Sequence, residues 1–139
     1  MAQHTSSTFG AAAEVPLLPH ILVVEDDVLV RVAAAQYLRG RGFPVLEAVN
    51  VDEAVDILRA DSLVRVVFAD VRLPGPRDGV ELARVIHRDF PKVEVLLTSG
   101  ISPFPELQGG VTLIKKPYFL VDIERHVRSL LARPRAGLG

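Results

Sequence analysis

The sequence predicts an α/β fold in which a parallel sheet is covered by helices on both faces. Short apolar runs, of the kind found in buried strands, alternate along the chain with longer stretches whose apolar residues recur at helical spacing. Parallel strands need crossover connections, which are usually helices, so this alternation is typical of such a sheet. The 139 residues, 49% of them hydrophobic, suffice for one domain with a single core.

Five segments are predicted to be strands, because each is short, largely apolar and bounded by polar or turn-forming residues. These segments are residues 21–24, 45–48, 64–69, 93–97 and 111–114. Only Arg65 interrupts the apolar run of the third. Continuous apolar runs indicate strands that are buried on both faces, as in the centre of an α/β domain.

Four helices are predicted between and after these strands. The first spans about 29–39 and ends before Gly40, and the second opens at Asn50 with the spacing of a capping box. Asp78 is expected to cap the third, and the last starts near Phe119. The apolar residues expected on the inner faces of the last three helices are Ala54, Val55, Leu58, Leu82, Val85, Ile86, Leu120, Ile123, Val127 and Leu130.

The connection between the fourth and fifth strands breaks the alternation. A helix cannot run through Pro103 and Pro105, because each lacks an amide donor and clashes with the preceding turn. At most one helical turn is expected after Pro105, before Gly109 and Gly110. The fourth crossover helix is therefore predicted to be shortened or missing.

Composition narrows the function classes. The formal net charge of −1 gives no reason to expect binding to nucleic acid, and there is no cysteine for disulfides or thiolate metal sites. No apolar run approaches the length of a membrane span. We expect a flexible N-terminal arm over 1–19, one domain over 20–132 and a frayed tail over 133–139, in a cytoplasmic protein without membrane contacts.

Polar residues gather where the predicted strands end. Glu25, Asp26 and Asp27 directly follow the first strand. Asp70 closes the third, Thr98 and Ser99 close the fourth, and Lys115 and Lys116 close the fifth. In a parallel sheet these positions share one edge, and ligands of doubly wound sheets bind at that edge. Residues far apart in the sequence are thus predicted to meet around one crevice.

The mixture of groups in this crevice favours phosphoryl chemistry. Clustered carboxylates repel one another, and a divalent cation removes the conflict. Oxygen ligands without His or Cys suit Mg²⁺, which binds through one or two carboxylates and bridges to phosphate. A carboxylate can also attack phosphorus to form an aspartyl phosphate. A lysine ammonium and a hydroxyl stabilise the charge of a transferred phosphoryl group.

The chain resembles the receiver domains of two-component response regulators. The matching segments, in the family's order between residues 20 and about 132, are 21–27 (ILVVEDD), 67–74 (VFADVRLP), 78–82 (DGVEL), 97–100 (LTSG) and 115–118 (KKPY). Each motif is weak alone, and the ordered set is strong. The resemblance implies a flavodoxin-like fold with strand order 2-1-3-4-5.

The same resemblance implies a Mg²⁺ site and a phosphorylation site. Asp70 matches the phosphoacceptor of the family. Glu25 and Asp26 match the acidic pair, with Asp26 the direct ligand of the metal. The backbone carbonyl of Arg72 is expected to complete the protein ligands of Mg²⁺.

Two further positions correspond to groups that contact the phosphoryl group in this family. Lys116, directly before Pro117, matches the lysine that pairs with it. Ser99 matches the switch hydroxyl, and Thr98 takes that place if the register is shifted by one residue.

Four features depart from the family pattern. The loop after Asp70 is one residue longer, through 75–77, and Leu113 stands where the family often has Tyr or Phe. The segment from Ser99 to Lys116 is several residues short. Arg72 places a long cation beside the site, with an effect on phosphoryl lifetime that the sequence does not give.

The resemblance implies a signalling switch, not a metabolic enzyme. Its expected phosphodonor is a histidine kinase or histidine phosphotransfer protein, and its output passes through an unknown downstream protein or a homodimer. Two other functions stay open: a degenerate receiver that binds partners without phosphorylation, and an Asp-nucleophile phosphohydrolase. Helix capping by residues 25–27, a turn role for Asp70, backbone contacts for Ser99 and packing roles for Tyr118 and Phe119 are the structural alternatives.

Overall fold

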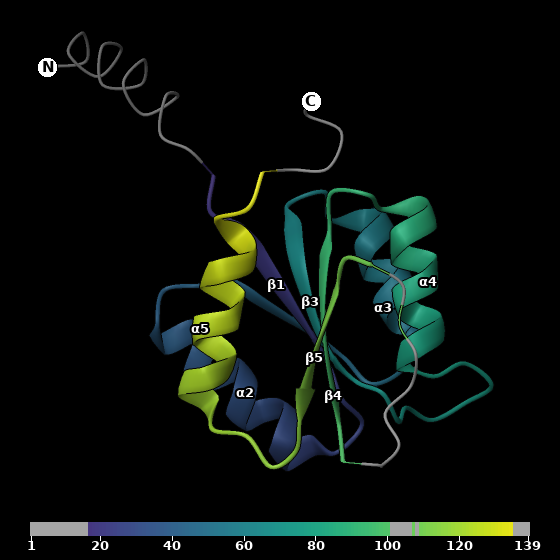
Figure 1. Cartoon of the computed structure of the whole chain (residues 1–139), viewed down its shortest axis with the longest axis horizontal. Coiled ribbons are helices and arrows are strands. Elements are labelled where there is room, and N and C mark those ends of the chain that lie inside the picture. Colours follow the sequence, from purple (N-terminus) through teal and green to yellow (C-terminus); the bar gives the residue numbers. More distant parts are fainter. Residues whose placement is uncertain (1–16, 101–106, 108, 135–139) are drawn as a thin grey trace, which may run out of the picture.

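Five parallel strands form one sheet in the order β2-β1-β3-β4-β5 (Figure 1). In this computed structural model, which describes residues 17–100, 107 and 109–134, all four strand pairs are parallel. The strands are β1 (His20–Val24), β2 (Val45–Ala48), β3 (Val64–Asp70), β4 (Glu94–Ser99) and β5 (Val111–Lys115). The predicted fold class and strand order are confirmed.

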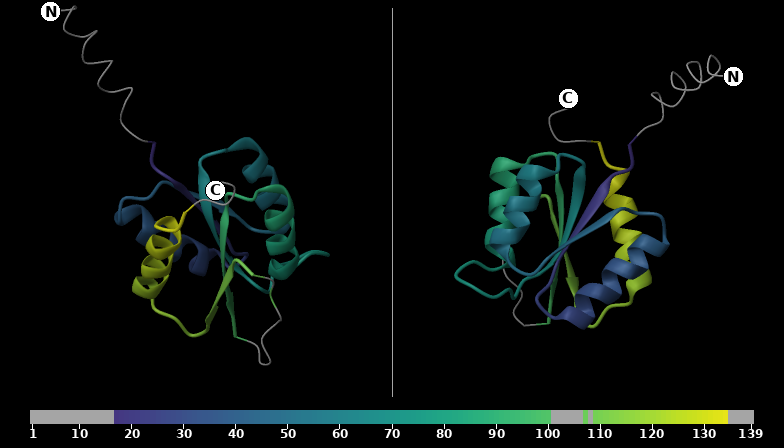
Figure 2. Two further views of the ribbon diagram at one scale, coloured as in Figure 1. Left: turned by 45° about the horizontal axis from the view of Figure 1, so that its top comes forward. Right: turned by 180° about the vertical axis from the view of Figure 1, so that it is seen from behind.

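Four helices cover the two faces of the sheet. They are α2 (Val28–Gly40), α3 (Val51–Ala60), α4 (Gly79–Asp89) and α5 (Leu120–Leu131). Helices α2 and α5 lie against one face, and α3 and α4 against the other (Figure 2). Each face has its own apolar cluster, with side chains of successive strand residues alternating between the two. The fold is thus doubly wound, as expected from the alternation of elements.

Short polar side chains start three of the helices. The carboxylate of Asp27 accepts backbone N–H bonds from Leu29 and Val30, at 2.9 and 3.1 Å. The Asn50 side chain accepts from Glu53 N–H at 2.8 Å, and Asp78 accepts from Glu81 N–H at 3.0 Å. These bonds satisfy amides that have no partner within the helix. Both predicted caps, Asn50 and Asp78, are confirmed.

The strands run further toward their carboxyl ends than the apolar runs indicate. Strand β3 includes Asp70, and β4 includes Thr98 and Ser99. Asp70 pairs with Thr98, and Ser99 pairs with Lys115. The backbone ladder does not depend on side-chain polarity, so the strands continue through the polar residues that end each apolar run. The candidate residues are therefore held by the sheet itself.

The link between β4 and β5 contains no helix among its described residues, which agrees with the predicted loss of the fourth crossover helix. The single turn expected after Pro105 lies in residues 101–106 and 108, outside the described part. The arm predicted over 1–19 falls mostly there as well, because the description starts at Leu17. Leu113 is half-buried and packs with the cluster under α3 and α4.

Candidate functional site

The carboxyl edge of the sheet brings most of the predicted site residues together. A depression of about 380 Å³ opens there. Its lining residues are Glu25, Asp26, Asp27, Val30, Asp70, Arg72, Leu73 and Lys116. They come from the ends of β1, β3 and β5, from the loops that follow, and, for Val30, from the first turn of α2. Segments that are 46 residues apart in sequence, at Asp70 and Lys116, thus share one small opening.

Asp70 is held at the floor of this depression by contacts to both carboxylate oxygens. Its Oδ1 accepts a hydrogen bond from Arg72 N–H at 2.9 Å, and its Oδ2 contacts the Lys116 ammonium. The residue is only 9% exposed. Both oxygens of Asp70 are thus held in place, and a carboxylate in this position can act as a nucleophile toward phosphorus.

Gly79 packs against the backbone at Asp70. A Cβ atom at this position would lie 2.3 Å from the carbonyl oxygen of Asp70 and 2.8 Å from the Cα of Val71. The Gly79 N–H donates to the carbonyl of Val71 at 2.8 Å. No side chain other than hydrogen fits this approach without displacing the end of β3. Glycine here therefore fixes the position of Asp70 relative to α4.

Glu25 is a second buried carboxylate in the site, also 9% exposed. Its pKa is raised to about 7, chiefly by burial, and the negative charge of Asp70 acts in the same direction. The N–H of Asp27, which donates to Glu25 Oε2 at 2.9 Å, and the Lys116 ammonium act in the opposite direction. The surroundings of Glu25 thus disfavour its ionised form, and raised pKa values of this kind are common at functional sites.

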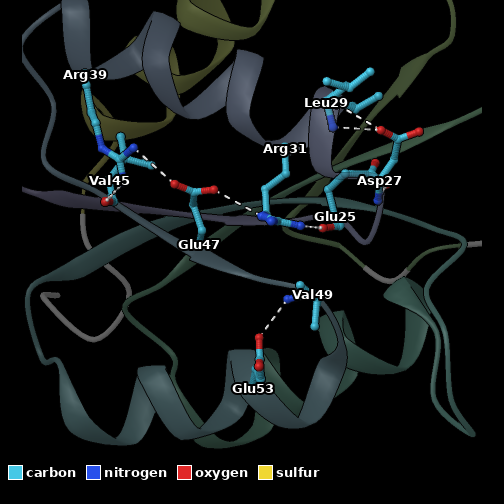
Figure 3. Close-up of polar contacts among 10 residues, drawn as sticks. Glu25, Asp27, Leu29, Arg31, Arg39, Val45, Glu47, Val49 and Glu53 are labelled. Carbon is cyan, nitrogen blue, oxygen red and sulfur yellow. Dashed lines mark hydrogen bonds and ion pairs between the residues drawn. The ribbon is translucent and has the colours of Figure 1, made fainter.

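The acidic loop after β1 is tied to its surroundings through its backbone (Figure 3). The guanidinium of Arg31 donates to the carbonyl of Glu25 at 3.0 Å and to Glu47 Oε1 at 3.1 Å. Asp27 caps α2, so the capping alternative holds for Asp27. It does not describe Glu25, whose carboxylate accepts the N–H of Asp27 and faces Asp70.

Both candidate hydroxyls lie at the end of β4, and each is 2% exposed. Thr98 stands directly beside Asp70 in the register, and Ser99 lies one residue closer to the carboxyl edge, beside Lys115. The carbonyl of Ser99 accepts the N–H of Lys116 at 2.9 Å. The strand therefore positions Lys116 and Ser99 together. Neither hydroxyl is among the residues that line the depression.

Tyr118 lies near the acids and packs against β3. Its ring meets Phe68 edge-on, with 5.8 Å between centroids. Burial raises the pKa of the Tyr118 hydroxyl, and the charges of Glu25 and Asp70 add to this. The packing role expected from the sequence agrees with this contact to Phe68. The proximity of Tyr118 to the two acids agrees with the expectation that the end of the fifth strand meets Glu25 and Asp70 at one edge of the sheet.

The donor set fits Mg²⁺ better than a tightly liganding metal. Among the described residues, no three His, Cys, Asp or Glu side chains form a group that could hold a metal ion alone. Mg²⁺ does not need such a group, because it binds proteins through one or two carboxylates and keeps several waters. The depression supplies Glu25, Asp26, Asp70 and the Arg72 segment, all offering oxygen ligands.

No described helix is long and apolar enough to cross a membrane.

Comparison with known proteins gives a consistent family. Residues 21–117 match the sequence profile of the response regulator receiver domain. The aerobic respiration control protein ArcA of Escherichia coli K12 is 29% identical over 119 residues, covering 83% of this chain and 49% of ArcA. A cyclic di-GMP phosphodiesterase of Thermotoga maritima is 34% identical over 102 residues, covering 70% of this chain and 27% of that protein. The chain thus spans about half or less of the length of these relatives.

Solved structures agree with the sequence comparison. The receiver domain of the hybrid histidine kinase CckA is 33% identical, with a TM-score of 0.70 over 81% of this chain and 98% of that domain. The response regulator TrrA of Thermotoga maritima, solved in complex with Mg²⁺–BeF, has a TM-score of 0.71 at 21% identity. That likeness covers 81% of this chain and 99% of TrrA and concerns the fold.

Proposed function

Because the chain belongs to the response regulator receiver domain family, we propose that it is a phosphorylation-controlled switch of a two-component pathway that accepts a phosphoryl group on Asp70. The observation that carries this proposal is the position of the Asp70 carboxylate, buried at the floor of an acidic depression and contacted by the Lys116 ammonium. Receiver domains act as signalling switches. A cytoplasmic location is part of the proposal.

The proposed reaction is a direct transfer. A carboxylate oxygen of Asp70 forms a bond to phosphorus, and the bond between phosphorus and the donor, an imidazole nitrogen of phosphohistidine, breaks. The Lys116 ammonium lies on one Asp70 oxygen and stabilises negative charge on the phosphoryl oxygens. The Arg72 N–H, 2.9 Å from the other oxygen, keeps the carboxylate oriented.

Glu25, Asp26, Asp70 and the Arg72 carbonyl are the proposed Mg²⁺ ligands. The bound ion would offset the repulsion between these acids and the incoming phosphoryl group. Two findings support the assignment: the burial of Glu25 beside the charge of Asp70, which raises the pKa of Glu25, and the similarity in fold to TrrA, which was solved with Mg²⁺–BeF. Glu25 and Asp26 sit side by side on one loop and differ in burial, so Asp26 offers the more accessible carboxylate.

Phosphorylation is proposed to signal by shifting a conformational equilibrium. A phosphoryl group favours one conformation only if it binds that conformation better. Ser99, at the end of β4 and next to Gly100, is the proposed hydroxyl that donates to the phosphoryl group, with Thr98 as the alternative. Leu113 offers no ring to move with that hydroxyl, so the response is expected to use other groups on β5.

A phosphodonor protein is the proposed partner at the rim of the site. Large apolar side chains are exposed at the start of α2, where Val30 lines the depression, and at the start of α5, which follows β5. They are Val28, Leu29, Val30, Phe119 and Val121, with Leu29 and Phe119 more than three-quarters exposed. A donor that delivers phosphohistidine to Asp70 has to cover this rim, and covering it removes apolar surface from water. The downstream target and any homodimer are not specified by this surface.

Intact-mass spectrometry with a small-molecule phosphodonor tests the proposal. The full chain, incubated with acetyl phosphate and Mg²⁺, is expected to gain the mass of one phosphoryl group. Asp70→Asn is expected to gain none. Asp56→Asn, which changes an exposed carboxylate on α3, serves as the matched control and is expected to behave as wild type. No gain in wild type would contradict the proposal and favour a receiver that works without phosphorylation.

A further inference from the structure

Arg31 joins the acidic loop to the neighbouring strand. Its side chain leaves the first turns of α2, is only 16% exposed, and reaches two groups at once. One is the backbone carbonyl of Glu25, 3.0 Å from Nη1, and the other is Glu47 Oε1 on β2, 3.1 Å from Nε (Figure 3). A planar guanidinium can hold two acceptors in fixed directions, which a lysine cannot do.

The carbonyl that Arg31 holds belongs to the peptide between Glu25 and Asp26. On the other side of Glu25, its N–H donates to the carbonyl of Ala48 at 2.9 Å. With both ends of Glu25 fixed, the backbone has little freedom to rotate at this residue. The direction in which the Asp26 carboxylate leaves the loop is set by the same peptide. Arg31 therefore acts on both acids through the backbone that carries them.

The positive charge of Arg31 is partly offset by Glu47, which Arg31 shares with Arg39. Glu47 Oε1 accepts from Arg31, and Glu47 Oε2 lies 3.1 Å from Nη1 of Arg39. Arg39 also donates to the carbonyl of Val45 at 2.8 Å, at the far end of α2 from the acidic loop. Without Glu47, the guanidinium of Arg31 would add an uncompensated positive charge close to a site that has to attract a cation.

We propose that Arg31 is a positioning residue for the divalent-cation site, acting through the backbone carbonyl of Glu25, with Glu47 as the group that neutralises its charge. This inference rests on the proposed function, because it assumes that Glu25 and Asp26 bind a cation. It assigns to Arg31 a role that the receiver motifs do not include. Arg39 is a natural control, because it shares the Glu47 partner but lies near the opposite end of α2.

Mn²⁺ binding to the full chain, measured from the electron paramagnetic resonance signal of free Mn²⁺, tests the inference. Arg31→Met is expected to weaken Mn²⁺ binding about tenfold, the size typical for groups that orient metal ligands. Arg39→Met is expected to change it less than about twofold. Arg31→Lys keeps a donor and the charge but cannot span both acceptors, and is expected to recover only part of the loss.

Glu47→Gln separates the charge effect from the loop effect. The substituted amide keeps an oxygen for Arg31 but leaves the charge of the guanidinium uncompensated, so Mn²⁺ is expected to bind more weakly at low salt. That loss is expected to shrink as salt is raised, because the depression that would hold the cation opens to solvent and added ions screen the field reaching it. The Arg31→Met loss is expected to persist at high salt, since it reflects geometry.

Thermal unfolding of the same variants shows whether Arg31 has only a structural role. If Arg31→Met binds Mn²⁺ as tightly as wild type, or if both arginine variants lose binding equally, the positioning role is wrong. The proposed function would still hold if the wild-type protein binds Mn²⁺ and accepts a phosphoryl group. Wild type that binds no Mn²⁺ would overturn both.

Discussion

Two buried glutamates show how differently this small fold treats the same side chain. Glu25 at the carboxyl edge and Glu124 in the seam between α2 and α5 are 9% and 5% exposed. Glu124 accepts from Arg128 at 2.9 Å, from Tyr37 at 3.0 Å and from Arg41 at 3.1 Å. Glu25 accepts the backbone N–H of Asp27 and faces Asp70.

The pKa values of the two carboxyls move in opposite directions as a result. The hydrogen bond from Arg128 is the largest cause of the lowered pKa of Glu124. Burial, with the charge of Asp70 added, raises the pKa of Glu25 to about 7. In the seam, three donors hydrogen-bond to the Glu124 carboxylate. At the site, the charge of Asp70 disfavours the ionised form of Glu25. A bound divalent cation would relieve this repulsion.

The largest expected effect comes from removing the positive charge of the Lys116 side chain. Lys116→Met is expected to slow phosphorylation by acetyl phosphate by about a hundredfold or more, the size typical for the loss of one group that stabilises developing charge. The neighbouring Lys115→Met, at an exposed position, is expected to retain most of the rate. A time course of intact mass measures both. Equal rates for the two variants would contradict the role of Lys116.

The backbone beside Asp70 is expected to tolerate an added side chain less well than the backbone at the end of α2. Gly79→Ala is expected to lower the free energy of unfolding by about 3 kcal/mol, because the new methyl group cannot avoid the Asp70 carbonyl. Gly40→Ala, at the end of α2, meets no atom within 4 Å and is expected to be neutral or slightly stabilising. Urea denaturation measures both changes. A Gly79→Ala protein as stable as wild type would refute the tight approach.

The seam is expected to behave as an ordinary stabilising network. Because the folded pKa of Glu124 is below its usual 4.5, its ionised form contributes stability above that value. The contribution is lost as the pH falls through the folded pKa. Glu124→Gln is expected to lower the free energy of unfolding at pH 7 and to flatten this acid-induced loss. Denaturation series at pH 3.5 and pH 7 provide the check.

Glu25 at the site is expected to give the opposite pH dependence of stability, with a smaller effect. The folded pKa of Glu25, about 7, lies above its ordinary 4.5. Its contribution to stability is therefore present below pH 4.5 and declines as the pH rises toward 7. In the presence of a chelator, Glu25→Gln is expected to raise the free energy of unfolding at pH 8 by about 1 kcal/mol. Destabilisation by Glu25→Gln at pH 8 would show that the site does not disfavour the ionised form of Glu25.

Sequence reasoning predicts the fold and the position of the acids well, because both depend on local signals. Apolar runs mark the strands, Asn50 and Asp78 mark helix starts, and polar residues after each run fall at one edge. The apolar runs stop short of the strand ends at Asp70 and Ser99, since hydrophobicity does not report where the backbone ladder stops. Register, which depends on the neighbouring strand, decides those ends.

The features missed by sequence reasoning all depend on contacts between distant segments. Glu124 lies 87 residues from Tyr37 and 83 from Arg41, so no periodicity reveals their network. The contact of Arg31 with Glu47 depends on how α2 lies on β2. Gly79 belongs to a segment that resembles the family, but its steric role becomes visible only where α4 meets the end of β3.

Chemical trapping of the phosphorylated residue tests the central claim most directly. Borohydride reduces an aspartyl phosphate to homoserine, so peptide mass mapping after reaction with acetyl phosphate and Mg²⁺ locates the acyl phosphate. Conversion is expected at Asp70, with Asp26 and Asp27 unchanged. Conversion at another carboxylate, or a phosphoryl group that resists reduction on a hydroxyl side chain, would contradict the account.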